Sequence, residues 1–243
     1  MNLITILITT LNSEIDIRNF LKSLNDQTSK CFDFIIVDGG STDKTIEVIK
    51  SSNLSYNLVV KSGLGIYEGI NLAIQNCKTE YYLVCGSDDL LDRFAISNIN
   101  NILNSNSNFD LILFSVIKNN KVQLSKAPNF INRRLGWQSI FSSHSIGTVI
   151  RKQLHDTFGL YNTQEKILSD GIFLTEVISK TSNIGVFNIT LGEFGQGGTS
   201  VINFYDNIFK IFKIQIRYYE FLPQIFLLVF RLIKYRKRFH YDC

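Results

Sequence analysis

Short apolar runs alternate with amphipathic segments along the first third of the chain. The apolar runs indicate buried strands, and the segments with apolar positions every three or four residues indicate helices. The expected strands cover residues 3–9, 32–37, 58–61 and 81–85, and the expected helices begin near Ser13, Thr45 and Ile66. Strands separated by helices predict βαβ units, and therefore a parallel sheet with helices on both faces.

The alternation changes after residue 89. A helix is expected at 95–103, a hairpin at 111–117 and 121–124, a strand at 146–150, helices at 153–158 and 170–180, a strand at 185–190 and a Gly-rich loop at 192–200. The length of 243 residues suits one large domain, or one domain with an extension. We predict one α/β domain over residues 1–202.

Residues 203–243 form a predicted C-terminal amphipathic helical extension. One apolar face recurs at Ile208, Phe212 and Ile216, Pro223 interrupts the pattern, and residues 225–230 are apolar on all sides. The uncharged run 221–230 is shorter than the roughly 20 residues that span a bilayer. Two interpretations remain open: a helix that lies in a membrane interface, or a hairpin that packs on the domain or on a second subunit of a homodimer.

The positive charge is concentrated in this extension. Residues 206–243 carry eight basic and three acidic residues, a net of +5, which leaves about −1 for the rest of a chain with net charge +4. The body of the protein is therefore not expected to bind nucleic acid. The four cysteines show no metal-ligand spacing, which favours reduced thiols in the cytoplasm. The first strand begins at Leu3 without a basic leader, so no signal peptide is expected.

The strand at 81–85 ends in a polar turn, Gly86-Ser87-Asp88-Asp89. Ligands of open α/β sheets bind beyond the carboxyl ends of the strands. Adjacent carboxylates there are costly unless a cation or a donor-rich ligand neutralises them, and hard divalent cations bridge phosphates. The turn therefore indicates a metal-diphosphate site. The alternative is a polar turn that caps the helix expected near Arg93.

Two nucleotide-binding classes of protein lack their characteristic motifs in this sequence. Thr9-Thr10-Leu11-Asn12 follows the first strand, where a dinucleotide-dependent oxidoreductase would carry G-x-G-x-x-G. No G-K-[ST] sequence of a P-loop kinase is present.

Four stretches in this order carry a resemblance to a known family: residues 6–12, 35–45, 65–71 and 86–89, with weaker matches at 144–151, 169–170 and 197–200. The chain resembles the family 2 glycosyltransferases. The likeness is greatest to bacterial enzymes of surface polysaccharide assembly, such as O-antigen, capsule and exopolysaccharide. The resemblance implies a GT-A fold, which is Rossmann-like with a mostly parallel central sheet and helices on both faces.

The resemblance assigns a role to each site residue. Asp170 is the implied catalytic base, Asp89 the ligand of Mg²⁺ or Mn²⁺, and His144 an acceptor-side residue. The donor and nucleotide would be bound by Thr9, Asn12, Glu14, Asp38, Tyr67, Asn71 and Asp88. Alternatives stay open for four residues: a helix N-terminal charge for Glu14, a core position for Tyr67, a helix cap for Asp170 and a core histidine for His144.

Two positions depart from the family pattern. The family usually has an acid at Gly63 and another at Ser169, so one donor contact and one acid beside the base are absent here. Ser41 and Asp43 are interpreted as turn and cap residues.

The resemblance implies an inverting, metal-dependent glycosyltransferase. It would transfer a sugar from a nucleoside-diphosphate donor, with a UDP-sugar as first choice, to a lipid-linked or glycan acceptor. The extension places it in the cytoplasm, peripheral to the inner face of the cytoplasmic membrane. The alternative is a non-catalytic, nucleotide-binding scaffold of a membrane polysaccharide-assembly complex.

Overall fold

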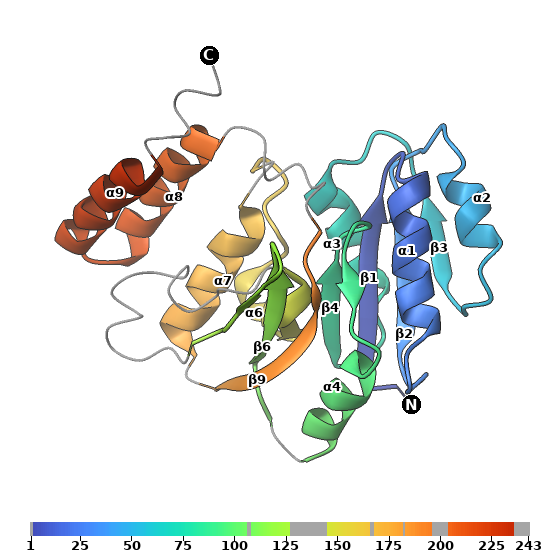
Figure 1. Cartoon of the computed structure of the whole chain (residues 1–243). Helices are drawn as coiled ribbons and strands as arrows, with labels where there is room; N and C mark the ends of the chain where they lie inside the picture. The colour runs from blue at the N-terminus through green and yellow to red at the C-terminus, as the bar shows by residue number, and fades with distance from the viewer. Residues whose placement is uncertain are drawn as a thin grey trace.

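The computed structural model describes residues 2–105, 108–126, 145–165, 168–181, 183–195 and 204–235. Within these ranges nine strands form one sheet, in the order β3-β2-β1-β4-β8-β6-β9-β5, with β7 paired to β6. Helices cover both of its faces, and the C-terminal helices stand beside the end that carries α7 (Figure 1). The predicted fold class is confirmed.

The N-terminal half of the sheet is wholly parallel. Its strands are β1 (Ile4–Thr10), β2 (Asp33–Asp38), β3 (Asn57–Val60) and β4 (Tyr81–Cys85). Thr10 stands opposite Asp38, and Ile8 stands opposite Cys85. The turns that follow these strands therefore emerge at one edge of the sheet, as the sequence predicted.

The C-terminal half mixes strand directions. It contains β5 (Leu90–Leu91), β6 (Leu111–Lys118), β7 (Lys121–Gln123), β8 (Thr148–Arg151) and β9 (Ile184–Glu193). Strand β8 runs antiparallel to β4 and β6, whereas β9 runs parallel to β6. A 3₁₀ turn at Ser145–Gly147 and helix α6 (Leu154–Phe158) flank β8.

One expected boundary is wrong in this half. The sequence predicts a loop from Gly192, but β9 continues through Glu193 because Gly192 pairs with Leu91 of the unexpected strand β5. A methyl group at Gly192 would lie 2.3 Å from the carbonyl oxygen of Leu90, so this close pairing needs glycine. Residues 196–200 of the expected loop lie outside the described residues.

Two helical layers enclose the sheet. On one face lie α1 (Glu14–Asn25), α2 (Thr45–Lys50) and α4 (Ala95–Asn104), packed on Ile4, Ile6 and Ile8 of β1. On the other lie α3 (Ile66–Asn76) and α7 (Ser169–Lys180), packed on a cluster that includes Leu7. The alternation along β1 explains the two layers, because successive side chains point to opposite faces.

The C-terminal extension is helical, as predicted, and its two helices form a hairpin, which was one of the two interpretations left open by the sequence. Helices α8 (Phe204–Tyr218) and α9 (Phe221–Tyr235) follow one another, and α8 joins the α7 side of the core through Ile211 and Ile214. The Tyr218 hydroxyl donates to Glu176 of α7 at 2.5 Å, and Arg231 of α9 donates to Gln215 at 3.1 Å. Among the described residues, no helix has the length and apolarity needed to cross a bilayer. The boundary at residue 202 stays a prediction.

Candidate functional site

The carboxylate of Asp38 organises the turn after β2. It is fully buried, and its two oxygens accept four hydrogen bonds: from the Thr10 and Ser41 hydroxyls at 2.8 and 2.6 Å, and from the Gly40 and Ser41 amides at 2.9 and 2.7 Å. A carboxylate offers about four such lone-pair positions. The carboxylate of Asp38 therefore stabilises its own loop, which the sequence did not predict. The predicted contact of Asp38 with the nucleotide stays a prediction.

Asn12 and Glu14 tie the turn after β1 to the turn after β2. The Asn12 amide oxygen accepts from the Thr42 backbone at 2.8 Å, and the Asn12 backbone donates to the Ser41 hydroxyl at 2.8 Å. The Glu14 carboxylate accepts from the Lys44 backbone at 3.0 Å and also lies in the first turn of α1. Both side chains hold the lip of the predicted nucleotide pocket in one shape.

Asp43 supports the starts of two helices, although the N-cap position of α2 is Lys44. Its carboxylate accepts from the backbone and hydroxyl of Thr45 at 3.0 and 2.6 Å, and from the backbone of Glu14 at 3.2 Å. These hydrogen bonds, led by that of the Thr45 hydroxyl, lower the pKa of Asp43. One partly buried acid therefore helps to fix the starts of α1 and α2.

Tyr67 and Asp170 meet, although 103 positions separate them in sequence. The Tyr67 hydroxyl donates to Asp170 Oδ1 at 2.8 Å. Tyr67 lies in the first turn of α3, just beyond the carboxyl end of β3, and Asp170 lies in the first turn of α7. The contact therefore brings the predicted base to the edge where the nucleotide turns emerge. The N-cap position of α7 is Leu168, so the alternative that Asp170 is the cap is wrong.

Thr9 and Asn71 lie where α3 meets its neighbours. A methyl group at Gly69 of α3 would lie 2.8 Å from Thr9 Cγ2, so glycine lets the helix approach β1 closely. The buried Asn71 amide donates to the Tyr161 carbonyl at 2.8 Å and accepts from the Tyr161 amide at 3.0 Å. Asn71 therefore joins α3 to the segment before α7, and its predicted donor contact stays a prediction.

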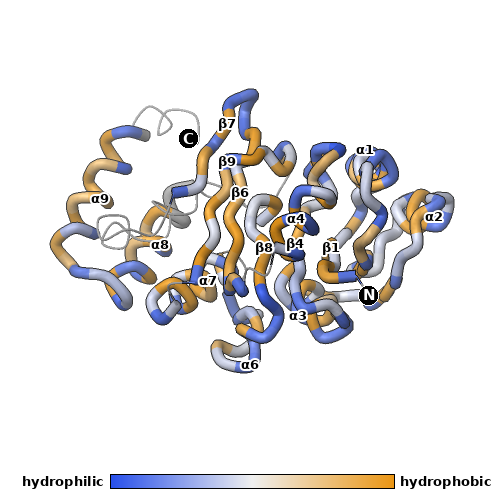
Figure 2. Tube along the Cα trace, turned by 90° about the horizontal axis from the view of Figure 1, so that it is seen from below, coloured by the Kyte–Doolittle hydropathy of each residue, from blue (hydrophilic) through white to orange (hydrophobic). Residues whose placement is uncertain are grey.

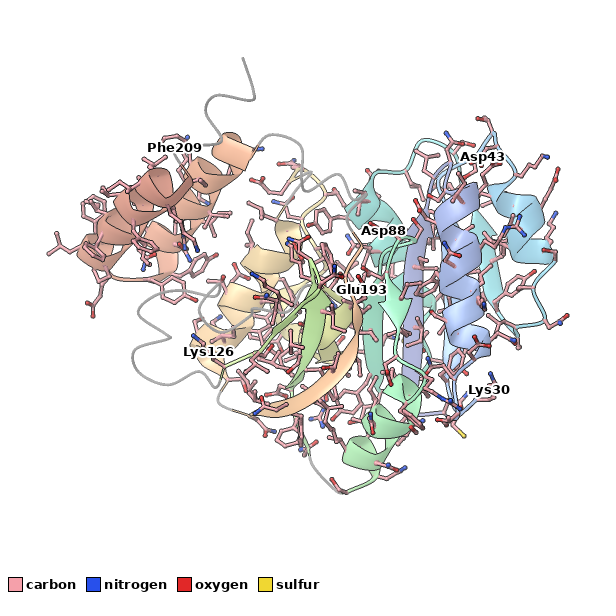
Figure 3. The ribbon with its side chains drawn as sticks, viewed as in Figure 1. Lys30, Asp43, Asp88, Lys126, Glu193 and Phe209 are labelled. Atoms are coloured by element: carbon pink, nitrogen blue, oxygen red, sulfur yellow. The ribbon has the colours of Figure 1, made fainter. Side chains whose placement is uncertain are left out.

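The paired acids after β4 have different surroundings. Asp89 is 1% exposed, and its oxygens accept from the Gly86 and Gly195 backbones at 2.7 and 2.9 Å. Burial raises the pKa of Asp89 to about 7, the charge of Asp88 adds to this, and the two amide donors oppose it. Asp88 is half-exposed near the middle of the molecule (Figure 3). Asp88 is thus the more exposed acid of the pair, while Asp89 holds the loop.

Neither acid caps the following helix. The carboxylate of Asp92 accepts from the Phe94 backbone at 2.8 Å, and its carbonyl accepts from Ala95 at 2.9 Å, so Asp92 shapes the start of α4. The alternative that Asp88 and Asp89 form a helix cap is therefore wrong. Strand β5 separates them from α4.

The donor set fits a divalent cation that shares its ligands with a phosphate. No group of three or more His, Cys, Asp or Glu side chains suited to a metal occurs among the described residues. Mg²⁺ is commonly held by one or two carboxylates together with substrate phosphates and waters. Asp88 is the more exposed of the two acids at the strand end, and the metal role that the sequence gave to Asp89 stays a prediction.

Gly195 is the contact that sequence reasoning missed. Its amide donates to Asp89, and a methyl group there would lie 2.2 Å from Asp88 Cγ. The segment after β9 therefore covers the acidic turn, and only glycine fits so close to it. The Gly-rich pattern at 192–200 predicted a loop, but it gave no signal for the distant turn that the loop contacts.

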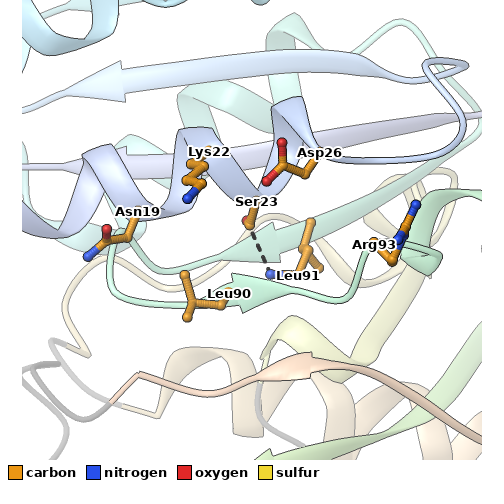
Figure 4. Close-up of a pocket in the computed structure, with 7 residues that line it drawn as sticks. All are labelled: Asn19, Lys22, Ser23, Asp26, Leu90, Leu91 and Arg93. Carbon is orange, nitrogen blue, oxygen red and sulfur yellow. Dashed lines mark hydrogen bonds between the residues drawn. The ribbon is translucent and has the colours of Figure 1, made fainter.

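A surface pocket of about 340 Å³ lies away from these residues (Figure 4). It lies between α1 and β5 and is lined by Asn19, Lys22, Ser23, Asp26, Leu90, Leu91 and Arg93. None of the predicted site residues lines it, so the pocket gives no support to the site. His144 lies outside the described residues, and its acceptor-side role stays a prediction.

The sequence of this chain is similar to those of known glycosyltransferases. The family model described as glycosyl transferase family 2 matches residues 5–159. A Mycobacterium bovis protein named PGL/p-HBAD biosynthesis glycosyltransferase is 25% identical over 220 residues, covering 82% of this chain and 80% of the relative.

Two solved structures share the fold. S. aureus TarS 1–349 in complex with UDP-GlcNAc has a TM-score of 0.69 at 18% identity, over 89% of this chain and 66% of that one. The mannosyltransferase PcManGT from Pyrobaculum calidifontis, in complex with GDP-Man and Mn²⁺, has a TM-score of 0.67 at 16% identity, over 91% and 66%. Since the family model spans more than half of the sequence, this chain belongs to glycosyl transferase family 2 and is a nucleotide-sugar-dependent glycosyltransferase.

Proposed function

We propose that this enzyme is an inverting, metal-dependent glycosyltransferase that acts in the synthesis of a bacterial surface polysaccharide. The observation that carries the proposal is the Tyr67–Asp170 contact, which brings a carboxylate from α7 to the edge formed by the donor-side turns. The name of the mycobacterial relative, which refers to biosynthesis of PGL/p-HBAD, supports the glycan context.

The donor is a nucleoside-diphosphate sugar, with a UDP-sugar as first choice. The rigid turns around Asp38 and Asn12 form the lip of its pocket, and they offer backbone and hydroxyl groups already held in place. The TarS complex with UDP-GlcNAc and the PcManGT complex with GDP-Man support a donor of this class. The side chains of Thr9, Glu14 and Tyr67 lie on the same edge.

Asp88 is the carboxylate that would hold Mg²⁺ or Mn²⁺. It is the more exposed member of the acidic pair, whereas the amides of Gly86 and Gly195 donate to Asp89. A bound cation would stabilise the negative charge that develops on the leaving diphosphate. The PcManGT complex with Mn²⁺ supports this requirement.

Asp170 is the base. Its carboxylate takes the proton of the acceptor hydroxyl while that oxygen attacks the anomeric carbon from the side opposite the diphosphate. The bond between the anomeric carbon and the phosphate oxygen breaks, and the nucleoside diphosphate leaves with the electron pair. One displacement of this kind inverts the anomeric configuration, and a base positioned beside the acceptor is its condition.

The acceptor is lipid-linked, and the enzyme reaches it on an anionic membrane surface at the cytoplasmic side. Helix α9 exposes an apolar stripe at helical spacing, made of Leu222, Ile225, Phe226, Val229, Phe230 and Ile233. Leu222 and Phe226 are 77% and 72% exposed. The hydropathy colouring shows α9 as largely apolar (Figure 2).

Charge favours lipid over a second copy as the partner of this stripe. Lys210, Lys213 and Arg217 are exposed on α8, Lys234 is exposed near the end of α9, and the sequence continues with Arg236, Lys237 and Arg238. Exposed cations around an apolar stripe complement anionic lipid, whereas two like-charged copies would repel each other. Because α8 packs on α7, the helix that carries Asp170, membrane binding by the hairpin would bring α7 close to the membrane surface.

Nucleotide release tests the proposal. Wild-type protein is mixed with UDP-, GDP- and dTDP-sugars, with Mg²⁺, Mn²⁺ or EDTA, and with a crude lipid-linked acceptor fraction. We expect release with one donor, only with metal, and a product whose anomeric configuration by NMR is opposite to that of the donor. Retained configuration, or full activity in EDTA, would contradict the proposal.

A further inference from the structure

The carboxylate of Asp170 is positioned by an unusual backbone turn. Leu168, two residues before it, has φ of 77°, in the left-handed region that branched side chains rarely adopt. Such strain persists only where the surrounding structure imposes it, and it is common at functional sites. The turn fixes where α7 begins, and so it fixes the place of Asp170 in the first turn.

Tyr67 supplies the second constraint. Its hydroxyl donates to Asp170 Oδ1 at 2.8 Å, and its ring packs on Tyr161 with centroids 5.8 Å apart. Burial, followed by the charge of Asp170, raises the pKa of Tyr67 well above its ordinary value. The hydroxyl therefore keeps its proton at neutral pH and remains a donor to the carboxylate.

The aromatic packing keeps Tyr67 from turning away. Tyr161 also packs edge-on against Phe173 of α7 at 5.2 Å, and its hydroxyl lies 3.0 Å from that of Tyr82 in β4. This cluster links α3, α7 and the sheet. The position of the Tyr67 hydroxyl is therefore set by packing within this aromatic cluster. Among the described residues, Tyr161 and Phe173 make no hydrogen bond to the Asp170 side chain.

We propose that Tyr67 is a positioning residue for Asp170: it holds one carboxylate oxygen so that the other faces the acceptor hydroxyl. This inference rests on the proposed role of Asp170 as base. A hydrogen bond to one oxygen limits rotation of the carboxylate and leaves Oδ2 to take the proton. Losses of about a hundredfold are typical when a reacting group is misplaced by about 1 Å.

Tyr67→Phe tests the inference, because it keeps the ring and removes only the hydroxyl. We expect kcat to fall by about 10- to 100-fold while KM for the donor changes by less than about twofold.

Tyr161→Phe is the matched control, because it removes a hydroxyl from the same cluster without touching Asp170. We expect it to keep kcat close to that of wild type, because the hydroxyl of Tyr67 that donates to Asp170 is still present. A double variant, Tyr67→Phe with Asp170→Asn, should be no slower than Asp170→Asn alone, because the hydroxyl acts only through the carboxylate. This comparison also holds if Tyr67→Phe lowers stability.

Two results separate this inference from the function on which it rests. If Asp170→Asn is inactive while Tyr67→Phe matches wild type, the positioning role alone is wrong. A rise in donor KM with unchanged kcat would likewise overturn it, because Tyr67 would then bind the donor. If Asp170→Asn keeps wild-type turnover, the base assignment fails and the positioning role fails with it.

Discussion

The two halves of the site are held together in different ways. On the proposed donor side, the turns after β1 and β2 are joined by a dense set of hydrogen bonds around Asp38, Asn12 and Asp43, between positions no more than 30 apart in sequence. On the proposed acceptor side, Asp170 has one side-chain hydrogen bond among the described residues, from Tyr67, which lies 103 positions away, and its helix follows the left-handed Leu168. The donor side is thus held by many hydrogen bonds between adjacent turns, whereas the position of Asp170 depends on few contacts between segments far apart in sequence.

This difference has a chemical meaning. If the turns of a nucleotide pocket are already ordered before the ligand binds, no binding free energy is lost in ordering them. The base must be free to accept a proton, so its carboxylate cannot be saturated with donors as that of Asp38 is. Changes on the donor side should therefore alter stability and binding, and changes on the acceptor side should alter turnover.

Asp170→Asn should have the largest effect. Loss of the base should lower kcat by about 10²- to 10⁴-fold, the usual contribution of general base catalysis. Nucleotide affinity, measured by calorimetry, should stay within about twofold of wild type. Asp156→Asn, on the exposed surface of α6, is the matched control. Equal losses in affinity and turnover would place Asp170 on the donor side and break the comparison.

The apolar stripe of α9 should give the next largest effect. Leu222→Gln with Phe226→Gln should weaken binding to vesicles that contain phosphatidylserine by about a hundredfold, because half-burying two such side chains contributes about 3 kcal/mol. Flotation or cosedimentation with anionic and zwitterionic vesicles measures it. Turnover of a water-soluble acceptor should not change.

The control changes two exposed apolar residues at the other end of the molecule, Ile15→Gln and Val60→Gln. Binding by wild type that is equal on zwitterionic vesicles would contradict the anionic surface. A wild-type dimer that becomes monomeric in the Leu222 and Phe226 variant, with no vesicle binding, would assign the stripe to a second copy.

Asp38→Asn tests how much the stability of the donor-side turn depends on this carboxylate. The amide would present hydrogens to the hydroxyls and backbone amides that now donate to Asp38, leaving buried donors unpaired. We expect the free energy of unfolding in urea to fall by about 2 kcal/mol. Asp26→Asn, on the exposed end of α1, should change it little. A stable Asp38→Asn protein would show that the turn does not depend on this acid.

His155 should give the smallest effect. It packs on Phe173 at 4.5 Å and accepts from or donates to Tyr82 at 2.6 Å, and burial lowers its pKa. The unfolded chain therefore takes up a proton near pH 6.5 before the folded one does, so stability should fall as pH decreases below about 6.5. One proton limits the slope to about 1.4 kcal/mol per pH unit.

Urea unfolding at pH 7.5 and 5.5 measures this slope, with His155→Phe as the comparison. The variant keeps an aromatic ring against Phe173 and retains the other two histidines, so the difference in slope isolates His155. An identical slope in both proteins would show that His155 is equally protonated in the folded and unfolded chains.

Much of the parallel half could be predicted from sequence. The strand at Tyr81–Cys85 has the predicted bounds, and the helix at Ile66–Asn76 begins where the sequence predicted, because apolar periodicity and flanking glycines are local signals. The strand β5 at Leu90–Leu91 was not predicted, because two residues carry no periodicity and its pairing with β9 joins positions about a hundred residues apart.

Contacts between positions far apart in sequence also limited the prediction of the site. The position of the acidic pair after β4 follows from its sequence, but the inward orientation of Asp89 depends on the amide of Gly195. The contact between Tyr67 and Asp170 also depends on how α7 packs near α3. A resemblance assigns roles to residues one by one, whereas the choice between two adjacent acids requires the three-dimensional contacts.

Metal-dependent nucleotide binding tests the central claim most directly. A thermal-shift series compares wild type, Asp88→Asn and Asp170→Asn with nucleoside diphosphates, with and without Mn²⁺; a ligand at a hundred times its Kd stabilises by about 2.7 kcal/mol. The account predicts an Mn²⁺-dependent rise in Tm for wild type and Asp170→Asn and none for Asp88→Asn. An undiminished rise in Asp88→Asn, or its loss in Asp170→Asn, would contradict the division of the site into a donor side and an acceptor side.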